Sequence, residues 1–95
     1  MITYNYEPEN NRVAAYLEDG TEVGKLTYNV IGDVWDADHT FVDADHRGGP
    51  IASEMLKLLV EKARELGKAI HPTCPYVAKT VDRTPEYHDV LRREL

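Results

Sequence analysis

The chain has 95 residues, of which 42% are hydrophobic and 29% are charged, and its formal net charge is −6 with a pI near 5.1. These proportions are ordinary for a folded domain and argue against wholesale disorder, and the length predicts one domain, residues 1–95, with one modest core. The acidic balance argues against a general binder of phosphate backbones, so we expect no nucleic-acid partner.

The sequence also predicts that neither a membrane nor a metal is involved. No window holds the roughly 20 consecutive apolar residues that a membrane helix needs, and the first residues lack the basic flank and apolar stretch of a secretory signal. We therefore expect a cytoplasmic location. One cysteine, Cys74, cannot form an internal disulfide, and with four scattered histidines it gives no zinc-ligand spacing.

The first half of the chain predicts an antiparallel meander. Two glycine-containing pairs indicate hairpin turns: Asp19-Gly20 is typical of type I′ and Gly32-Asp33 of type II′. Within the last two strands, alternation places Leu26, Tyr28 and Val30 on one face, and Trp35, Ala37, His39 and Phe41 likewise on one face. The expected strands are rich in Val, Tyr, Thr and Ile, and they cover Thr3–Tyr6, Arg12–Leu17, Val23–Ile31 and Val34–Val42.

The second half changes to a helical period. From Pro50 to Leu66 apolar residues recur every three or four positions, and Gly67 follows as a helix-ending residue. A short strand is expected at Ala69–His71, followed by two short helices at Val77–Arg83 and Glu86–Arg93. The fold class is therefore α+β, with a meander leading into a right-handed β-α-β crossover around one long helix.

The crossover brings two loops together. The strands ending at Val42 and His71 finish on the same edge of the sheet, so the loop Arg47–Gly49 and residues 73–75 become neighbours. Ligands of such units bind beyond the carboxyl ends of the strands. Because the loop runs straight into a helix, its backbone N–H groups and the positive end of the helix dipole favour an anion such as a phosphate. An ordinary strand-to-helix turn with a solvated arginine is the alternative.

Four segments in order resemble the short single-domain branch of the GNAT superfamily of acyl-CoA-dependent N-acetyltransferases. They extend over about residues 39 to 90: His39-Thr40, the loop Arg47–Ala52, the segment Pro72–Val77 and Pro85–Tyr87. The resemblance implies a compact GNAT-like fold. It also implies acetyl-CoA as cosubstrate and an amine acceptor, either a protein or a small molecule.

The resemblance further implies which residues bind the cosubstrate. The diphosphate would contact Arg47, Gly48, Gly49, Ile51 and Ala52, the pantetheine arm would run along Phe41 and Val42, and the thioester would approach Cys74, Pro75 and Tyr76. Two features depart from the superfamily. Pro50 stands where a glycine is expected and has no N–H to offer, and the chain lacks the helical insertion between the first two strands, which leaves the acceptor side open.

For the chemistry we expect the amine to attack the thioester directly. A backbone N–H near Phe41 to Asp43 would stabilise the oxyanion, and His39 would accept the amine proton. Cys74 would protonate the departing thiolate or act as a nucleophile, and direct transfer is favoured because no activating base lies beside it in sequence. The alternatives stay open: Cys74 and His39 as packing residues, or a non-catalytic CoA-binding or protein-interaction module, as a monomer or weak homodimer.

Overall fold

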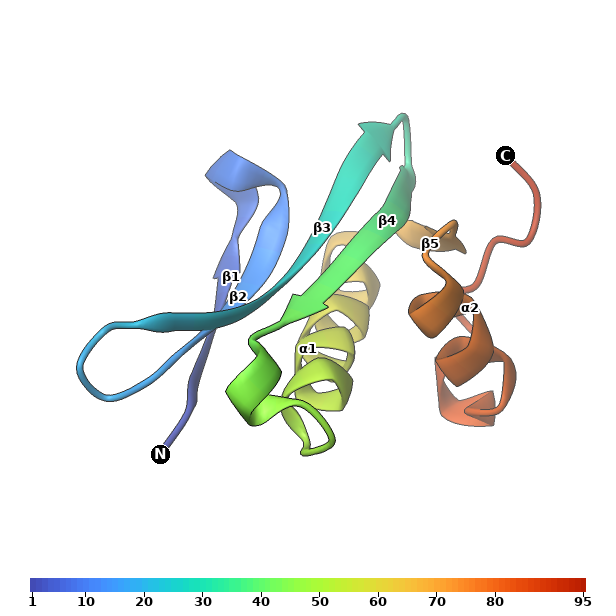
Figure 1. Ribbon diagram of the computed structural model, residues 1–95. Coiled ribbons are helices and arrows are strands. Elements are labelled where there is room, and N and C mark those ends of the chain that lie inside the picture. Colours follow the sequence, from blue (N-terminus) through green and yellow to red (C-terminus); the bar gives the residue numbers. More distant parts are fainter.

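The computed structural model describes all 95 residues, and its strands form one five-stranded sheet in the order of the sequence (Figure 1). The first four strands are antiparallel and the fifth is parallel to the fourth. This arrangement confirms the α+β class and the meander that leads into a β-α-β crossover. The strands are β1 (Thr3–Glu7), β2 (Arg12–Tyr16), β3 (Glu22–Ile31), β4 (Val34–Val42) and β5 (Ala69–Pro72).

Two α-helices and three short 3-10 helices complete the fold. Helix α1 (Ile51–Leu66) connects β4 to β5 and ends at Gly67, which has a φ of 71°. Helix α2 (Pro75–Asp82) follows β5 and begins two residues before the predicted start, because Pro75 is suited to the first helical position. The 3-10 helices are η1 (Pro8–Asn10), η2 (Ala44–His46) and η3 (Pro85–Tyr87).

One of the two predicted turn types is right. Gly32 has a positive φ of 58° and Asp33 does not, which is the pattern of a type II′ turn. The type I′ turn predicted at Asp19-Gly20 is wrong, since only Gly20 has a positive φ. The Asp19 carboxylate instead accepts a hydrogen bond of 2.9 Å from the Thr21 N–H, which holds a wider loop.

A β-bulge interrupts the pairing of β3 with β4. Thr27 lies opposite His39 and Tyr28 lies opposite Ala37, so Asp38 is an extra residue on β4. The Asp38 carboxylate accepts hydrogen bonds from Thr27 at 2.7 Å and from Asn29 at 3.0 Å. Asp38 and His39 therefore face the same side of the sheet, although they are consecutive residues.

The bulge overturns the predicted facing of the end of β4. Trp35 and Ala37 are buried against α1 as expected, but His39 and Phe41 are exposed on the opposite face. Thr40 and Val42 take the inward positions instead, opposite Leu26 and Gly24 of β3. The prediction that His39 and Phe41 share the face of Trp35 is wrong because one inserted residue inverts the alternation beyond it.

Helix α1 packs across the inner face of the sheet and supplies most of the core. Its buried residues meet Val13, Leu26 and Trp35 from three strands, and Trp35 stacks on Tyr28 with ring centres 4.5 Å apart. The first turn of α1 lies close to β3 at Gly24, where a Cβ atom would stand 3.0 Å from Cγ2 of Ile51. The buried residues of α1 are Ile51, Met55, Leu56, Leu59, Val60 and Ala63.

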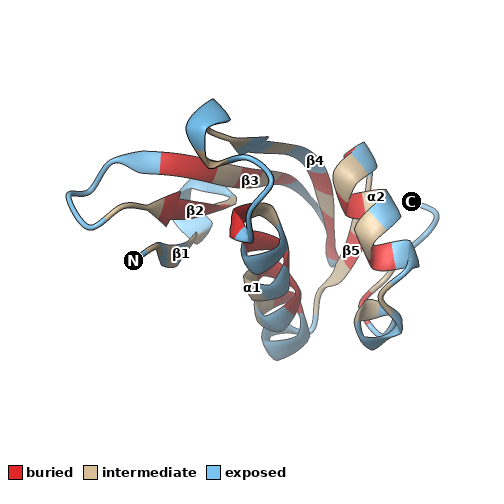
Figure 2. Ribbon diagram, turned by 60° about the horizontal axis from the view of Figure 1, so that its bottom comes forward, coloured by how far each residue is buried: buried red, intermediate tan, exposed pale blue.

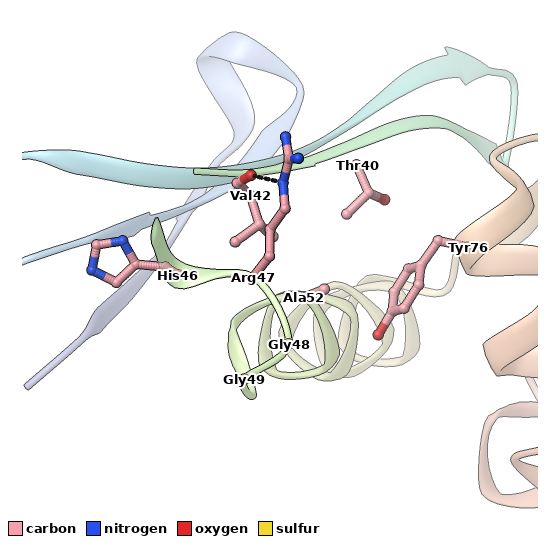
Figure 3. Close-up of a pocket in the computed structure, with 8 residues that line it drawn as sticks. All are labelled: Thr40, Val42, His46, Arg47, Gly48, Gly49, Ala52 and Tyr76. Carbon is pink, nitrogen blue, oxygen red and sulfur yellow. Dashed lines mark hydrogen bonds between the residues drawn. The ribbon is translucent and has the colours of Figure 1, made fainter. Parts of the chain in front are cut away.

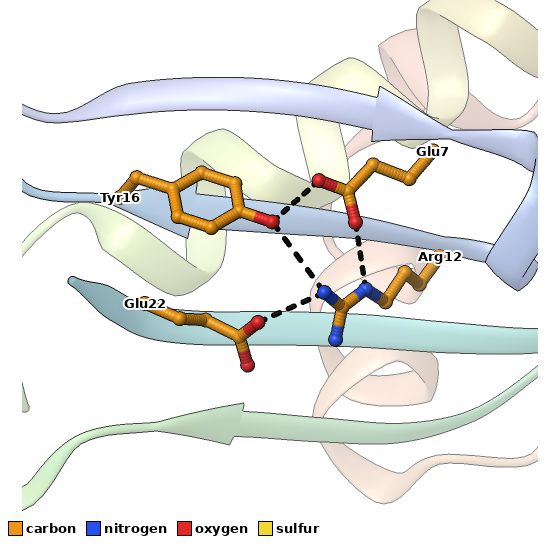
Figure 4. A network of polar contacts seen from close by, with 4 residues as sticks. All are labelled: Glu7, Arg12, Tyr16 and Glu22. Atoms are coloured by element: carbon orange, nitrogen blue, oxygen red, sulfur yellow. Dashed lines mark hydrogen bonds and ion pairs between the residues drawn. The ribbon is translucent and has the colours of Figure 1, made fainter. Parts of the chain in front are cut away.

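The outer face of the sheet carries no α-helix (Figure 2). A network on β1, β2 and β3 occupies part of it: Arg12 donates to Glu7 at 2.8 Å and to Glu22 at 2.9 Å, and the Tyr16 hydroxyl donates to Glu7 at 2.5 Å (Figure 4). These side chains satisfy one another's hydrogen-bonding groups, so this part of the face is polar.

The helix predicted at Glu86–Arg93 is wrong. After η3 the chain extends along the free edge of β5, where the Ile70 N–H donates to Val90 O at 2.7 Å and the Arg92 N–H donates to Ile70 O at 2.8 Å. Backbone pairing with an edge strand overrides the helical pattern of this segment, because unpaired edge groups need partners. Arg64 of α1 anchors the segment through two hydrogen bonds to Asp89, at 2.7 and 2.8 Å.

Candidate functional site

Strand β5 pairs along its whole length with the beginning of β4, and beyond β5 the two chain segments separate. Their register runs from Val34 opposite Ala69 to Ala37 opposite Pro72, and the Cys74 N–H closes the seam with a bond of 2.7 Å to Ala37 O. Beyond this point β4 pairs with β3 alone. Its other edge is open, and the opening lies next to the starts of both α-helices.

A pocket of about 250 Å³ occupies this region (Figure 3). The loop Arg47–Gly49 lines it together with Tyr76, which comes one residue after the predicted neighbours 73–75. Four segments of the chain line it: the open end of β4, the loop after β4, the first turn of α1 and the first turn of α2. The lining residues are Thr40, Val42, His46, Arg47, Gly48, Gly49, Ala52 and Tyr76.

Five backbone N–H groups around this loop donate to no acceptor within the protein. The first backbone bond of α1 runs from the Glu54 N–H to Pro50 O at 2.9 Å, which leaves the preceding N–H groups of the helix free. Pro50 lacks an N–H, but its φ of −85° and ψ of −1° already fit a helix start. The free N–H groups belong to Gly48, Gly49, Ile51, Ala52 and Ser53.

Arg47 adds the positive charge of the site. Its Nε donates a hydrogen bond of 2.9 Å to Val42 O, and its guanidinium carbon lies 6.0 Å from the centre of the Phe41 ring. No carboxylate forms an ion pair with it. The remaining guanidinium N–H groups therefore have no ion-pair partner, and in the structure they lie beside β4 and point away from the start of α1 (Figure 3).

The open edge of β4 presents backbone groups in a regular pattern. The Asp43 N–H donates to Val23 O at 2.8 Å, so the backbone N–H and C=O groups of the odd-numbered residues at this end of β4 point toward β3. Those of Thr40 and Val42 consequently point toward the opening. The predicted oxyanion donor near Phe41 to Asp43 is therefore narrowed to the Val42 N–H, since that of Asp43 is engaged.

Cys74 lies at the inner end of the opening. It is the residue before α2, its exposed fraction is 6%, and its Sγ lies 3.4 Å from Thr40 Oγ1. Cys74 does not line the pocket itself, whereas Thr40 does. The hydroxyl of Thr40 therefore separates the thiol from the pocket.

The structure assembles some of the predicted site residues and not others. Phe41 contacts the pocket only through the Arg47 guanidinium, Ile51 is buried in the core, and Pro75 begins α2 without lining the pocket. His39 lies on the outer face, away from the pocket lining. The predicted residues that line it are Val42, Arg47, Gly48, Gly49, Ala52 and Tyr76.

Sequence reasoning missed two lining residues, Thr40 and His46. Thr40 belongs to the His39-Thr40 pair but was expected on the other face, and only the bulge brings it inward. His46 lies in η2, and it is held at the loop by a contact of 3.3 Å between Nδ1 and the Asp43 carboxylate. The spacing of Asp43 and His46, three residues apart in a short turn, is the signal that could have indicated this contact.

Neither a metal site nor a membrane span is found in the structure. No three His, Cys, Asp or Glu side chains are grouped so that they could hold a metal ion. Neither α-helix has the length and apolar character needed to cross a bilayer.

The comparison with protein families decides the identity of the fold. The model of the GCN5-related N-acetyltransferases, the superfamily also called GNAT, matches residues 12–90. The chain belongs to this family. The match includes β4, the loop at Arg47, all of α1 and the start of α2, so the whole pocket lies within the GNAT match.

Solved structures support the GNAT fold. A GCN5-like protein from Staphylococcus aureus superposes with a TM-score of 0.77 at 21% identity, covering 98% of this chain and 90% of that one. A structure assigned to the acyl-CoA N-acyltransferases from Klebsiella pneumoniae subsp. pneumoniae MGH 78578 gives 0.62 at 17% identity, covering 86% of this chain and 59% of that one.

A ribosomal-protein-alanine N-acetyltransferase from Brucella melitensis biovar Abortus 2308 gives a TM-score of 0.53 at 24% identity, covering 88% of this chain and 65% of that one. The GNAT chain described here thus spans less than two thirds of the length of these last two proteins. None of the curated proteins matches it significantly.

Proposed function

We propose that this protein is an acetyl-CoA-dependent N-acetyltransferase that transfers an acetyl group to an amine by direct attack on the thioester. The observation that carries the proposal is the group of free N–H donors at Gly48, Gly49, Ile51, Ala52 and Ser53. Arg47 directly precedes them, and a change of its side-chain rotamer would bring the guanidinium to a diphosphate held there. A diphosphate has oxygen atoms enough to accept several of these bonds, and the α1 dipole favours its charge. Because Pro50 has no N–H, the diphosphate has one hydrogen-bond donor fewer at this loop, and five remain.

The open edge of β4 supports a binding site for the rest of the cosubstrate. A pantetheine arm contains two amide groups, and the unpaired backbone N–H and C=O of Thr40 can pair with such an amide as a neighbouring strand would. An arm that begins at the α1 start and follows this edge leads toward Thr40 and Cys74. The Val42 N–H is the available donor for the oxyanion that develops on the thioester carbonyl.

The bare outer face supports entry of the amine from the side opposite to the cosubstrate. His39 faces that side at the same level of β4 as Thr40, which faces the pocket. In this arrangement His39, or a water molecule that it orders, accepts the amine proton. Because no helix covers the outer face, a bulky acceptor such as a protein N-terminus or lysine can reach it as readily as a small amine.

The test combines turnover with binding. Purified protein is incubated with acetyl-CoA and a panel of polyamines, amino acids and unstructured peptides, and free CoA thiol and acetylated product are measured by a thiol reagent and mass spectrometry. We expect thiol release that depends on the acceptor. Calorimetric binding of acetyl-CoA without turnover on any acceptor would support a non-catalytic CoA-binding module instead, and absence of binding would overturn both functions.

A further inference from the structure

We propose that Thr40 is a catalytic residue that passes a proton from Cys74 to the departing CoA thiolate. This inference rests on the proposed function, and it assigns a role to a residue that the sequence pattern placed on the wrong face. Three observations carry it: the position of Thr40 in the pocket, its contact with Cys74, and the location of Cys74 at the start of α2.

The position of Thr40 depends on the bulge at Asp38. Without the extra residue, Thr40 would face the outer side of the sheet and His39 the pocket. With it, the Thr40 side chain lines the pocket beside Val42 and Tyr76 (Figure 3). A threonine hydroxyl is donor and acceptor at once, so it can give one proton to a ligand while receiving another.

The partner that supplies this second proton is the buried thiol. Thr40 Oγ1 and Cys74 Sγ are 3.4 Å apart, a hydrogen-bond contact for sulfur, and either atom can be the donor. Since Cys74 is only 6% exposed and does not line the pocket, the hydroxyl is its route to a bound thioester. Cys74 therefore acts through Thr40 in this scheme and does not attack the substrate.

The start of α2 stabilises the charge that Cys74 carries briefly. The first backbone bond of this helix runs from the Ala78 N–H to Cys74 O at 2.9 Å, and the N–H groups of Tyr76 and Val77 have no acceptor in the protein. A thiolate at a helix N-terminus is favoured by these groups and by the dipole. The α2 start thus provides the local field that a proton-donating thiol requires.

The proton balance of the step is closed. As the tetrahedral adduct collapses, its carbon–sulfur bond breaks and the electron pair goes to the CoA sulfur, which takes the Thr40 Oγ1 proton while Thr40 takes the Cys74 Sγ proton. Cys74 then regains a proton from water, which receives the proton that the amine lost. Both ends of the relay are alkyl thiols, so transfer between them is nearly thermoneutral, and no free alkoxide forms on Thr40.

The experiment compares Thr40→Val, which has the same shape without the hydroxyl, with Thr40→Ser, which keeps it. Thr3→Val, at an exposed position on β1, is the matched control. We expect Thr40→Val to lower kcat by roughly 100-fold, the usual scale of general acid catalysis, with acetyl-CoA affinity changed less than threefold. Thr40→Ser should recover most of the rate, and the control should match the wild type.

A second readout follows Cys74 directly. The rate of alkylation of Cys74 by iodoacetamide, measured against pH by mass spectrometry, should change in Thr40→Val and return toward the wild-type profile in Thr40→Ser. Wild-type turnover that survives unchanged in a folded Thr40→Val protein would overturn the relay while leaving the acetyltransferase in place. A wild-type chain that acetylates no amine would overturn the proposed function and the relay together.

Discussion

The Nε of Arg47 donates a hydrogen bond of 2.9 Å to the carbonyl oxygen of Val42, and this bond joins the loop Arg47–Gly49 to the open edge of β4. This bond uses one N–H of the guanidinium and holds the side chain against the edge of β4, with its terminal nitrogens pointing away from the start of α1 (Figure 3). Arg47 therefore links the two halves of the proposed cosubstrate site, the cradle for the diphosphate and the strand edge for the arm.

Replacement of Arg47 should weaken binding of acetyl-CoA. Arg47→Ala removes a charge-assisted contact of about 1.5 to 3 kcal/mol, which corresponds to roughly 10- to 100-fold in Kd by calorimetry. Arg47→Lys keeps the charge but not the planar fork and should fall between. Arg92→Ala, an exposed arginine outside the pocket, is the control. An affinity of Arg47→Ala equal to that of the control would contradict the placement of the diphosphate.

Restoring an N–H at position 50 should strengthen binding. Pro50→Ala adds the missing donor at a backbone conformation that alanine adopts readily, φ −85° and ψ −1°, so we expect a Kd several-fold lower. Pro50→Gly adds the same donor but loosens the loop, and it should gain less while lowering the unfolding free energy by about 1 kcal/mol. Weaker binding by both variants would mean that the proline ring itself contributes to the site.

Loss of the imidazole at His39 should slow acetyl transfer without affecting the cosubstrate. His39 lies on the outer face, apart from the pocket lining, so His39→Ala should leave the Kd for acetyl-CoA unchanged. General base catalysis contributes about 100-fold or more, and kcat should fall accordingly. Imidazole added to the buffer should restore part of the rate to His39→Ala, and an undiminished kcat would leave His39 without a catalytic role.

The close approach of α1 to β3 at Gly24 should make this glycine difficult to replace. A Cβ there would lie 3.0 Å from Ile51, 3.2 Å from Met55 and 3.3 Å from the Phe41 carbonyl oxygen. Gly24→Ala should lower the unfolding free energy by about 1 to 3 kcal/mol, because overpacking forces α1 away from the sheet. Urea denaturation measures this, with Gly49→Ala as the comparison, since its Cβ would meet only His46 O at 3.8 Å.

The network on the outer face should make stability depend on pH. The hydrogen bond from Tyr16, followed by that from Arg12, lowers the pKa of Glu7 below its usual 4.5. A lowered folded-state pKa contributes stability that is present above the unfolded-state value and lost as pH falls through the folded-state value. Glu7→Gln should therefore be less stable than wild type by on the order of 1 kcal/mol at pH 7.

The difference between Glu7→Gln and wild type should shrink in urea titrations as the pH falls below 4.5, where the unfolded chain takes up the proton first, and it should be lost once the pH passes the lowered pKa of Glu7 in the folded protein. Glu94→Gln, which removes an exposed carboxylate near the end of the chain, should show no such dependence. A constant difference at all pH values would mean that the network stabilises the fold through packing alone.

The pattern of residues predicted most of the elements because each carries a local signal. The period of α1 and Gly67 determine the long helix, and Gly32 marks the turn of the central hairpin. The bulge at Asp38 has no such local signal. A bulged residue is recognised by its lack of a partner on the neighbouring strand, and the sequence of β4 alone does not show this pairing. As a result His39 and Thr40 exchanged faces between prediction and structure.

The helix prediction for Glu86–Arg93 was wrong for a related reason. Val90 and Leu91 fit a helical pattern, but the free edge of β5 offers backbone partners at Ile70 that a helix would forgo. Contacts between segments distant in sequence decide such a case, and a single sequence does not report them. The Arg47 loop, in contrast, could be predicted as a candidate anion site, because the glycines, the arginine and the start of the following helix are consecutive in the sequence.

The open edge of β4 also predicts a pattern of hydrogen exchange. In the ligand-free protein the amide protons of Thr40 and Val42 face solvent at the seam, so they should exchange for deuterium faster than those of Phe41 and Asp43 beside them. If an extended cosubstrate serves as a temporary sixth strand, saturating CoA should slow exchange at the even-numbered pair and leave the odd-numbered pair as it was. That alternation would trace the path of the bound arm one residue at a time.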